Sequence, residues 1–122
     1  MNHEPERSEM HEYSIVQALF EQIEHQAAIH QARSVERVVV RIGELSGVEA
    51  ALLQTAYLTF RERTICARAP LEIAAVAARW VCRNCGATLP RGRVLRCESC
   101  GGAGRLAQGD EILLERIEME VA

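Results

Sequence analysis

The spacing of hydrophobic residues divides the first half of the chain into a helix, a strand and a second helix. From Ser14 onward, apolar residues recur every three or four positions, which is typical of an amphipathic helix. They are Ile15, Leu19, Phe20, Ile23 and Ala27. In RVVVRIGEL, at 37–45, alternation predicts a strand with Val38, Val40 and Ile42 on one face. The motif Ser46-x-x-Glu49 fits a capping box and predicts a second helix. Its expected buried face comprises Val48, Leu52, Leu53, Ala56 and Phe60.

Two further strands are predicted in the second half of the chain. The segment LEIAAVAARW, at 71–80, predicts a strand that runs up to the first cysteine motif. The C-terminal segment alternates from Glu115 to Val121 and predicts a closing strand. Between them, GGAGRLAQGD at 101–110 is rich in glycine, and we expect it to be flexible. The predicted fold is α/β: a small mixed sheet of about three strands packed with two helices, plus an inserted four-cysteine, zinc-ribbon-like segment.

Four of the five cysteines form two C-x-x-C-G motifs, CRNCG at 82–86 and CESCG at 97–101. Each motif can present two thiolates to one metal ion, and its glycine lets the backbone turn past the sulfurs. A site with four sulfur ligands has no open position, which indicates a structural role and favours Zn(II), with iron as the alternative metal. Disulfides are the other alternative, and they are uncommon in cytosolic proteins. The predicted zinc ligands are Cys82, Cys85, Cys97 and Cys100.

Composition excludes several classes of protein. A chain of 122 residues with 48% hydrophobic and 25% charged residues is typical of one soluble globular domain. The N-terminus is polar and acidic, and no apolar stretch is long enough to span a bilayer, so we expect a cytoplasmic protein without membrane contact. All fourteen basic residues are arginine, which excludes a P-loop lysine and Schiff-base chemistry. No Ser/His/Asp set or open metal position supports an enzyme.

The charge of the chain is unevenly distributed. Residues 79–105 carry six arginines and one acid, Glu98, whereas the rest of the chain carries eight arginines and sixteen acids. A positive segment around zinc motifs is typical of a nucleic-acid-binding or protein-interaction module, which is the main alternative function. The acidic remainder would repel a phosphate backbone, and Trp80 is the only aromatic residue of the segment that could stack on a base. We therefore expect no nucleic-acid partner, and instead expect the loop RGRVLR at 91–96 to face an acidic surface.

The order of these features resembles the HypA/HybF family of hydrogenase nickel-incorporation proteins. The resemblance covers about residues 10–122 and rests on Met10-His11-Glu12, the segment IGELSGV and the paired cysteine motifs. It implies a nickel metallochaperone that carries Ni(II) as cargo and keeps a separate structural Zn(II). It further implies a GTPase accessory protein as partner, the [NiFe]-hydrogenase large subunit as the recipient, a role with urease maturation proteins as an alternative, and a monomer or homodimer.

The resemblance also assigns domains and ligands. Residues 1–9 would be a flexible extension, 10–78 and 107–122 a nickel-binding α/β domain, and 79–106 a zinc-binding domain. His11 would be the side-chain nickel ligand and Glu12 its neighbour in the motif, while Met10 would contribute its backbone.

The nickel motif departs from the family pattern because nine residues, MNHEPERSE, precede Met10, which therefore has no free amine. Imidazole, deprotonated backbone amides and an amine together give the strong in-plane field of square-planar Ni(II). Either the working chain begins at Met10, or another group, such as the Glu9–Met10 amide, replaces the amine. The extension also offers its own candidate site, because a free amine at Met1, two amides and the His3 imidazole form a four-nitrogen set for Ni(II) or Cu(II).

Three other residues with metal-binding side chains lie outside these motifs. We expect His25 and His30 to be solvated on a helix face and Cys66 to be a small, partly buried apolar residue.

Overall fold

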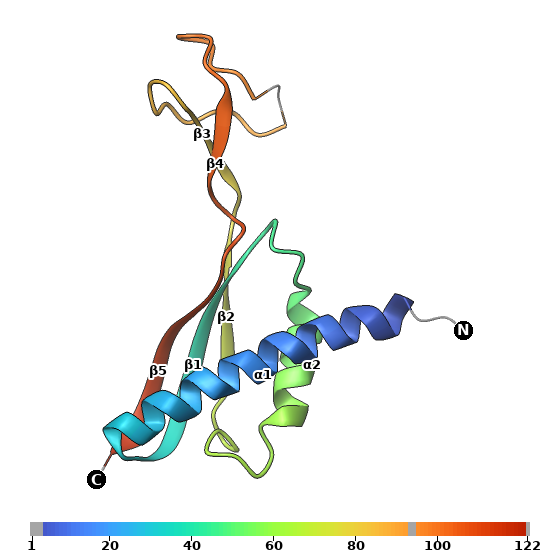
Figure 1. Ribbon diagram of the computed structural model, residues 1–122, viewed down its shortest axis with the longest axis vertical. Coiled ribbons are helices and arrows are strands. Elements are labelled where there is room, and N and C mark those ends of the chain that lie inside the picture. Colours follow the sequence, from blue (N-terminus) through green and yellow to red (C-terminus); the bar gives the residue numbers. More distant parts are fainter. Residues whose placement is uncertain (1–3, 93–94, 122) are drawn as a thin grey trace.

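The computed structural model describes the backbone of residues 4–92 and 95–121, and the side chains of 11–92 and 95–121. Figure 1 shows an elongated molecule, with a body of two helices on a sheet and a smaller part that projects from one end. We call this projecting part, residues 79–108, the cysteine unit. No helix in the described part of the chain is long and apolar enough to cross a membrane. The elements are α1 (Glu4–His30), β1 (Ala32–Gly43), α2 (Ala50–Phe60), β2 (Leu71–Val76), β3 (Arg79–Cys82), β4 (Gly104–Gln108) and β5 (Ile112–Val121).

The sheet of the body has the order β2-β1-β5 and is mixed, as predicted. Strand β1 pairs parallel with β2 and antiparallel with β5, so it is covered along both edges. Its side chains Val38, Val40 and Ile42 are buried in the main hydrophobic core, which confirms the predicted alternation. The cysteine unit follows β2 and precedes β5, so it is an insertion between two strands of one sheet, as the sequence indicated.

Helix α1 begins earlier than predicted, at Glu4 rather than near Ser14. Proline is favoured in the first turn of a helix, which is where Pro5 lies. No residue between Pro5 and Ser14 interrupts the helix. The backbone of residues 4–9, which we expected to belong to a flexible extension, is helical, and Met10-His11-Glu12 lies within the same helix.

The helices cover the sheet through the apolar stripes that periodicity predicted, with a few exceptions. On α1, Leu19, Phe20, Ile23 and Ala27 are buried as expected, Ile15 is partly buried, and Val16 is buried as well. On α2, Leu53 and Ala56 are buried, whereas Phe60 is 36% exposed, so its predicted burial is wrong. Tyr57, which the pattern missed, is fully buried because its hydroxyl donates a hydrogen bond of 2.7 Å to the carbonyl of Ala69.

The predicted strand from Leu71 to the first cysteine motif is two strands in different sheets. Strand β2 ends at Val76, and β3 pairs with β4 in a separate two-stranded sheet. The chain leaves the first sheet because the N–H of Ala78 donates to the Glu44 carboxylate instead of to a neighbouring strand. The expectation that 101–110 is flexible is wrong for Gly104–Gln108, which forms β4. The domain boundary that we predicted at residue 106 falls inside this strand.

Candidate metal centres

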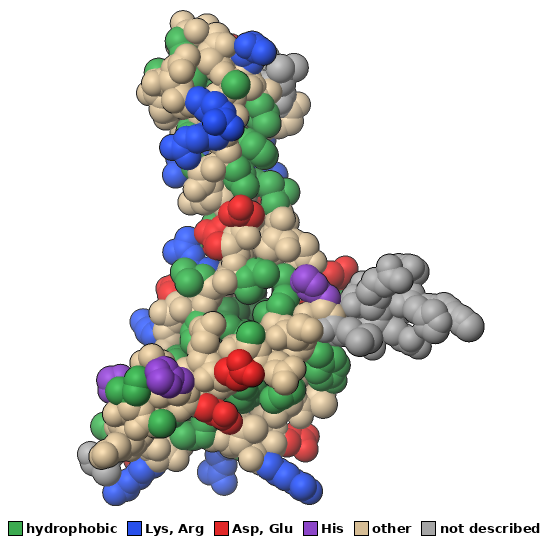
Figure 2. Space-filling model, viewed as in Figure 1, with side chains coloured by type: hydrophobic (Ala, Val, Ile, Leu, Met, Phe, Trp, Pro, Cys, Tyr) green, Lys and Arg blue, Asp and Glu red, His purple; other side chains and the backbone are tan. Residues whose placement is uncertain are grey.

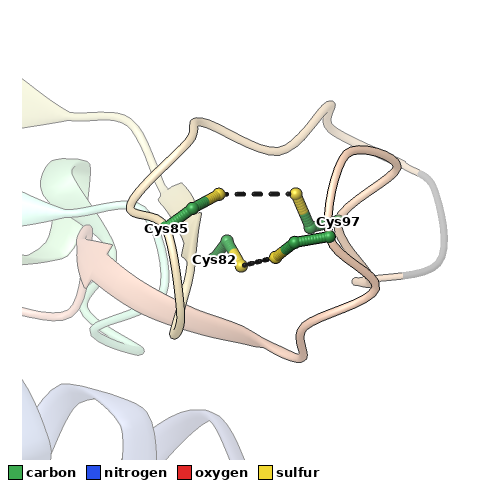
Figure 3. A group of neighbouring side chains, drawn as sticks. Cys82, Cys85 and Cys97 are labelled. Atoms are coloured by element: carbon green, nitrogen blue, oxygen red, sulfur yellow. Dashed lines mark hydrogen bonds between the residues drawn. The ribbon is translucent and has the colours of Figure 1, made fainter.

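The four predicted zinc ligands converge on one point. The Sγ atoms of Cys82, Cys85, Cys97 and Cys100 all lie within 4.8 Å of one another, the only such metal-binding group in the described part of the chain. Two facing pairs are separated by 3.4 Å and 3.7 Å, and Figure 3 shows the cysteines of the two motifs facing each other. Zinc with four sulfurs at about 2.3 Å requires sulfur separations of about 3.8 Å. A disulfide would need about 2.05 Å. The geometry therefore fits a tetrahedral ion.

The two cysteine motifs have the same backbone turn. Gly86 donates its N–H to the carbonyl of Cys82 at 3.0 Å, and Gly101 donates to Cys97 at 2.8 Å. Both glycines have a φ of 77°, a left-handed conformation that residues with a side chain rarely adopt. The turn also aims backbone N–H groups at sulfur, as in the 3.3 Å hydrogen bond from Asn84 to the Sγ of Cys82. The sequence motif thus fixes the local geometry by itself.

These N–H groups favour the charged form of the first cysteine in each motif. Hydrogen bonds from the backbone of Cys85, and then of Asn84, lower the pKa of the Cys82 thiol to about 6. The backbone of Cys100 lowers the pKa of the Cys97 thiol in the same way. The pKa of Cys100 is raised to about 11, because its hydrogen bond to Cys82 and its burial outweigh the favourable N–H of Gly102. Four thiols this close cannot all ionise without a cation, so the cluster is built for a positively charged ion.

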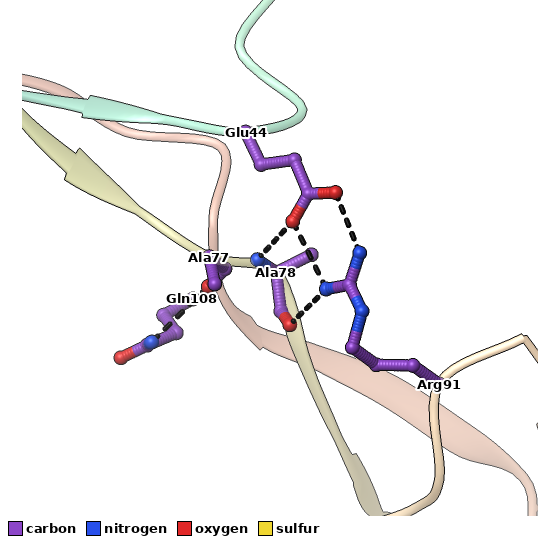
Figure 4. Close-up of polar contacts among 5 residues, drawn as sticks. All are labelled: Glu44, Ala77, Ala78, Arg91 and Gln108. Carbon is purple, nitrogen blue, oxygen red and sulfur yellow. Dashed lines mark hydrogen bonds and ion pairs between the residues drawn. The ribbon is translucent and has the colours of Figure 1, made fainter.

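Glu44, at the end of β1, joins the body to the cysteine unit. Its carboxylate accepts the N–H of Ala78 at 2.7 Å and both terminal nitrogens of Arg91, at 3.0 Å and 2.6 Å (Figure 4). Arg91 also donates to the carbonyl of Ala78 at 3.0 Å. The chain segments cross tightly here, since a Cβ atom at Gly43 would lie 2.2 Å from the carbonyl carbon of Gly109. We call these contacts the junction. They fix how the cysteine unit is held on the body.

Glu44→Gln should loosen the junction at neutral pH. Arg91, and then the N–H of Ala78, lower the pKa of Glu44 to about 2, so its stabilising effect is complete above its ordinary pKa and is lost as the pH falls toward 2. Acid would also protonate the thiolates, so substitution at pH 7 is the cleaner test. Residual dipolar couplings of the body and the cysteine unit should fit one alignment tensor in the wild type but two in Glu44→Gln. Glu72→Gln, which removes a glutamate paired with Arg37 on the sheet, is the control. One tensor for all three proteins would contradict this role of Glu44.

The Met10-His11-Glu12 motif is divided between surface and interior. His11 is exposed, whereas the Glu12 side chain is only 2% exposed. Glu12 Oε2 accepts the backbone N–H of Glu49 at 2.9 Å, and Glu12 Oε1 is buried without a hydrogen-bond partner among the described residues. The two adjacent side chains therefore do not form a joint surface site. His3 lies outside the described residues.

Glu12 caps the start of α2, a role that we predicted for Ser46 and Glu49. Helix α2 begins at Ala50, and its N-cap residue Glu49 makes no side-chain capping bond. Ser46 accepts the N–H of Val48 at 3.2 Å, so the predicted capping box is not formed. The Glu12 carboxylate, from α1, instead occupies the positive end of α2, where a buried negative charge is stabilised.

Glu12→Ala should destabilise the protein even without nickel. The substitution leaves the N–H of Glu49 without its acceptor, an expected cost of about 1–3 kcal/mol in free energy of unfolding. Glu12→Gln retains an oxygen that can accept this N–H, so it should lower the free energy of unfolding by less. Urea denaturation of zinc-loaded, nickel-free protein measures this, with the exposed Glu21→Ala on the same helix as control. Equal stability of Glu12→Ala and Glu21→Ala would rule out the capping role.

The remaining candidate ligands are where the sequence placed them. His25 and His30 are exposed and line a groove of about 460 Å³ between α1 and β5. Cys66 is fully buried in the core of the body, more completely than expected, and burial raises the pKa of its thiol to about 11. A neutral, buried thiol is a packing residue rather than a reactive group.

The chain matches a known protein family over most of its length. The sequence model of a family described as "HypA: Hydrogenase/urease nickel incorporation, metallochaperone, hypA" matches residues 10–119. This chain belongs to the HypA family. The match begins at Met10, the first residue of the proposed nickel motif, and includes all four clustered cysteines. The resemblance inferred from the sequence is thus confirmed.

Curated relatives and solved structures of HypA proteins support the assignment. Hydrogenase maturation factor HypA of Wolinella succinogenes is 43% identical over 114 residues, covering 91% of this chain and 96% of that protein. The same factor of Shewanella oneidensis is 43% identical over 115 residues, covering 93% of this chain and 98% of that protein. The solution structure of the Ni metallochaperone HypA from Helicobacter pylori has a TM-score of 0.68 at 34% identity, covering 91% and 98%. A second HypA solution structure has a TM-score of 0.76 at 35% identity, covering 93% and 98%.

Proposed function

We propose that this HypA protein binds one Ni(II) through the Met10-His11-Glu12 segment and delivers it, with a nickel-insertion GTPase, to the large subunit of a [NiFe]-hydrogenase. The observation that carries the proposal is that the family match starts at this segment, where the His11 imidazole is exposed on a helix whose later turns pack on the sheet. The relatives named hydrogenase maturation factors support hydrogenase as the destination. Urease maturation is the alternative destination, since the family description names both enzymes. The proposed location is the cytoplasm, and the proposed state is a monomer or homodimer.

We propose Zn(II) as the ion of the four-cysteine cluster, with a structural role. The sulfur separations fit a tetrahedral ion, and all four positions are taken by protein ligands. Such an ion would fix the fold of the cysteine unit and would not be passed on. The cargo site needs the opposite properties, namely few side-chain ligands and exposure to the receiving protein, which His11 provides and the cysteine cluster does not.

The form that binds nickel is proposed to be the one in which Met10 carries the free amine. In the long chain, helix α1 begins at Glu4, so the amides of Met10, His11 and Glu12 point at carbonyls one turn earlier. Nickel could deprotonate and bind them only after this turn unwound. In a chain that begins at Met10, the same amides belong to the first turn, whose N–H groups have no acceptor within the helix. Amine, amides and the His11 imidazole would then be free to form a square-planar set. Glu12 would meanwhile keep its carboxylate on α2, so it would contribute only its backbone.

The test is a nickel titration, by calorimetry and absorbance, of zinc-loaded protein that begins at Met1 or at Met10. The proposal predicts one nickel with a square-planar absorption band in the Met10 form, and weaker binding in the Met1 form because part of α1 must unwind. Nickel binding in the Met1 form that survives His11→Ala but is lost in His3→Ala would move the site to the extension. Absence of specific binding at both lengths would refute the carrier role.

A further inference from the structure

Three arginines of the cysteine unit lie on one face of its small sheet. Side chains alternate along a strand, so Arg79 and Val81 share a face of β3, and Arg105 of β4 is the cross-strand partner of Val81. The pairing continues beyond β3, since the N–H of Arg83 donates to the carbonyl of Ala103 at 2.9 Å, which puts Arg83 on the same face. All three arginines are exposed. We call them the arginine face.

The arginine face is not neutralised within the protein. Among the described residues, Arg79, Arg83 and Arg105 have no ion pair and no side-chain hydrogen bond. Arginines on the main sheet differ, since Arg37 and Arg41 each pair with two glutamates. In the view of Figure 2, basic side chains lie on both sides of the cysteine unit and are most numerous on one of them, whereas the acidic side chains lie at the junction and on the body.

Two arginines of the loop that we expected to face an acidic surface have partners within the protein. Arg91 is bound to Glu44 at the junction, and Arg96 donates to the carbonyl of Gly101 at 3.1 Å. These two arginines hold the unit together and in place. Among the described arginines of the unit, those of the arginine face are therefore the ones without a partner, and the contacts of Arg91 at the junction hold the unit on the body (Figure 4).

We propose that Arg79, Arg83 and Arg105 bind a carboxylate-rich surface of a protein partner. The guanidinium group suits carboxylates because two parallel N–H groups can bind both oxygens of one carboxylate. A nucleic acid fits less well, because Trp80, the one aromatic side chain of the unit, points to the opposite face of β3 and packs on the core beneath the cysteines. The arginine face does not include the nickel motif, so the proposed partner surface and the proposed nickel site can be tested, and can fail, independently.

The experiment is an NMR titration of the zinc-loaded full chain, at low ionic strength, with a decaglutamate peptide and separately with the oligonucleotide (dT)10. The test variant, Arg79→Glu/Arg83→Glu/Arg105→Glu, reverses the charge of the arginine face. The matched control, Arg33→Glu/Arg63→Glu/Arg68→Glu, reverses three exposed arginines of the body that also lack a partner among the described residues, so the change in net charge is equal. Zinc content and the nickel titration of each variant report whether folding and cargo binding are intact.

Decaglutamate should perturb the amides of β3, Arg83 and β4, and the test variant should bind it about tenfold more weakly, the sum of three exposed charge pairs. The control variant should change its affinity less than twofold. Equal loss in both variants, or no binding of decaglutamate to the wild type, would overturn the proposal. Tighter binding of (dT)10 than of decaglutamate to the same residues would overturn it in favour of a nucleic-acid partner.

Discussion

Cys82→Ser is expected to release the metal and unfold the cysteine unit while the body stays folded. The unit has very little apolar core: among its described residues, the buried hydrophobic side chains besides Cys82 and Cys97 are Val81 and Leu89, and Trp80 and Leu95 pack against the cluster around Leu89. A structural zinc ion supplies about 10–16 kcal/mol to small domains of this kind, so its loss cannot be offset by so small a core. The body keeps its own core between the two helices and the three-stranded sheet, which the substitution does not touch.

The chain contains its own reporter for this result. Its single tryptophan, Trp80, is half-buried in the cysteine unit, so Cys82→Ser or chelation should shift its emission toward that of solvated indole. NMR signals of β1, β2 and β5 should remain dispersed. Cys66→Ala is the control, because it removes a cysteine from the body and should leave zinc stoichiometry and Trp80 emission unchanged. Unchanged emission after complete removal of the metal would show that the unit folds without it.

His11→Ala is expected to abolish specific nickel binding in the chain that begins at Met10. Of the two side chains of the proposed site that the structure describes, the His11 imidazole is exposed and the Glu12 carboxylate is buried against α2. Without the imidazole, the proposed set would be reduced to an amine and two amides, and the nitrogen that completes the four-nitrogen square plane would be missing. Removing a residue that only hydrogen-bonds to a metal ligand lowers metal affinity by about 10–100-fold. Removing the ligand itself should therefore lower nickel affinity by more than about 100-fold. Calorimetry and the square-planar absorption band measure both affinity and geometry.

A matched substitution separates the ligand from general effects of charge. His25→Ala removes an exposed histidine from the same helix and should bind nickel as the wild type does. Nickel affinity should also fall as the pH is lowered, because the imidazole and the amides must lose protons to bind. Equal loss in His11→Ala and His25→Ala would place the site in the middle of α1. Retained affinity in both would remove His11 from the site.

The elements that could be predicted are those encoded by short-range patterns. The stripe on α1 and the alternation of β1 repeat at fixed spacings over many residues, and each cysteine motif contains its whole turn within five residues. A signal for the burial of Glu12 was also present. Glu12 lies four residues before Val16, so extending the apolar stripe of α1 by one turn reaches it. The local pattern does not indicate that a carboxylate continues the stripe, because its hydrogen-bond partner is the N–H of Glu49, on another element.

The contacts that could not be predicted join residues far apart in the chain. Glu44 and Arg91 are separated by 47 positions, and nothing in the local pattern of either indicates that they meet. Strand β4 is short and follows several glycines, and it is ordered only because β3 pairs with it. The division of the predicted strand into β2 and β3 also depends on a distant residue, because the Glu44 carboxylate accepts the N–H of Ala78 between them. Sequence therefore predicted the two motifs, whereas the junction required the structure.

X-ray absorption at the zinc and nickel edges of one sample tests the central claim most directly, that two metals occupy two chemically different sites. The sample is the Met10 form loaded with one zinc and one nickel. The account predicts four sulfur neighbours at about 2.3 Å around zinc, and only nitrogen or oxygen neighbours, with imidazole scattering, around nickel. Sulfur neighbours around nickel would contradict it, because the cysteine cluster would then hold the cargo and the Met10-His11-Glu12 segment would not.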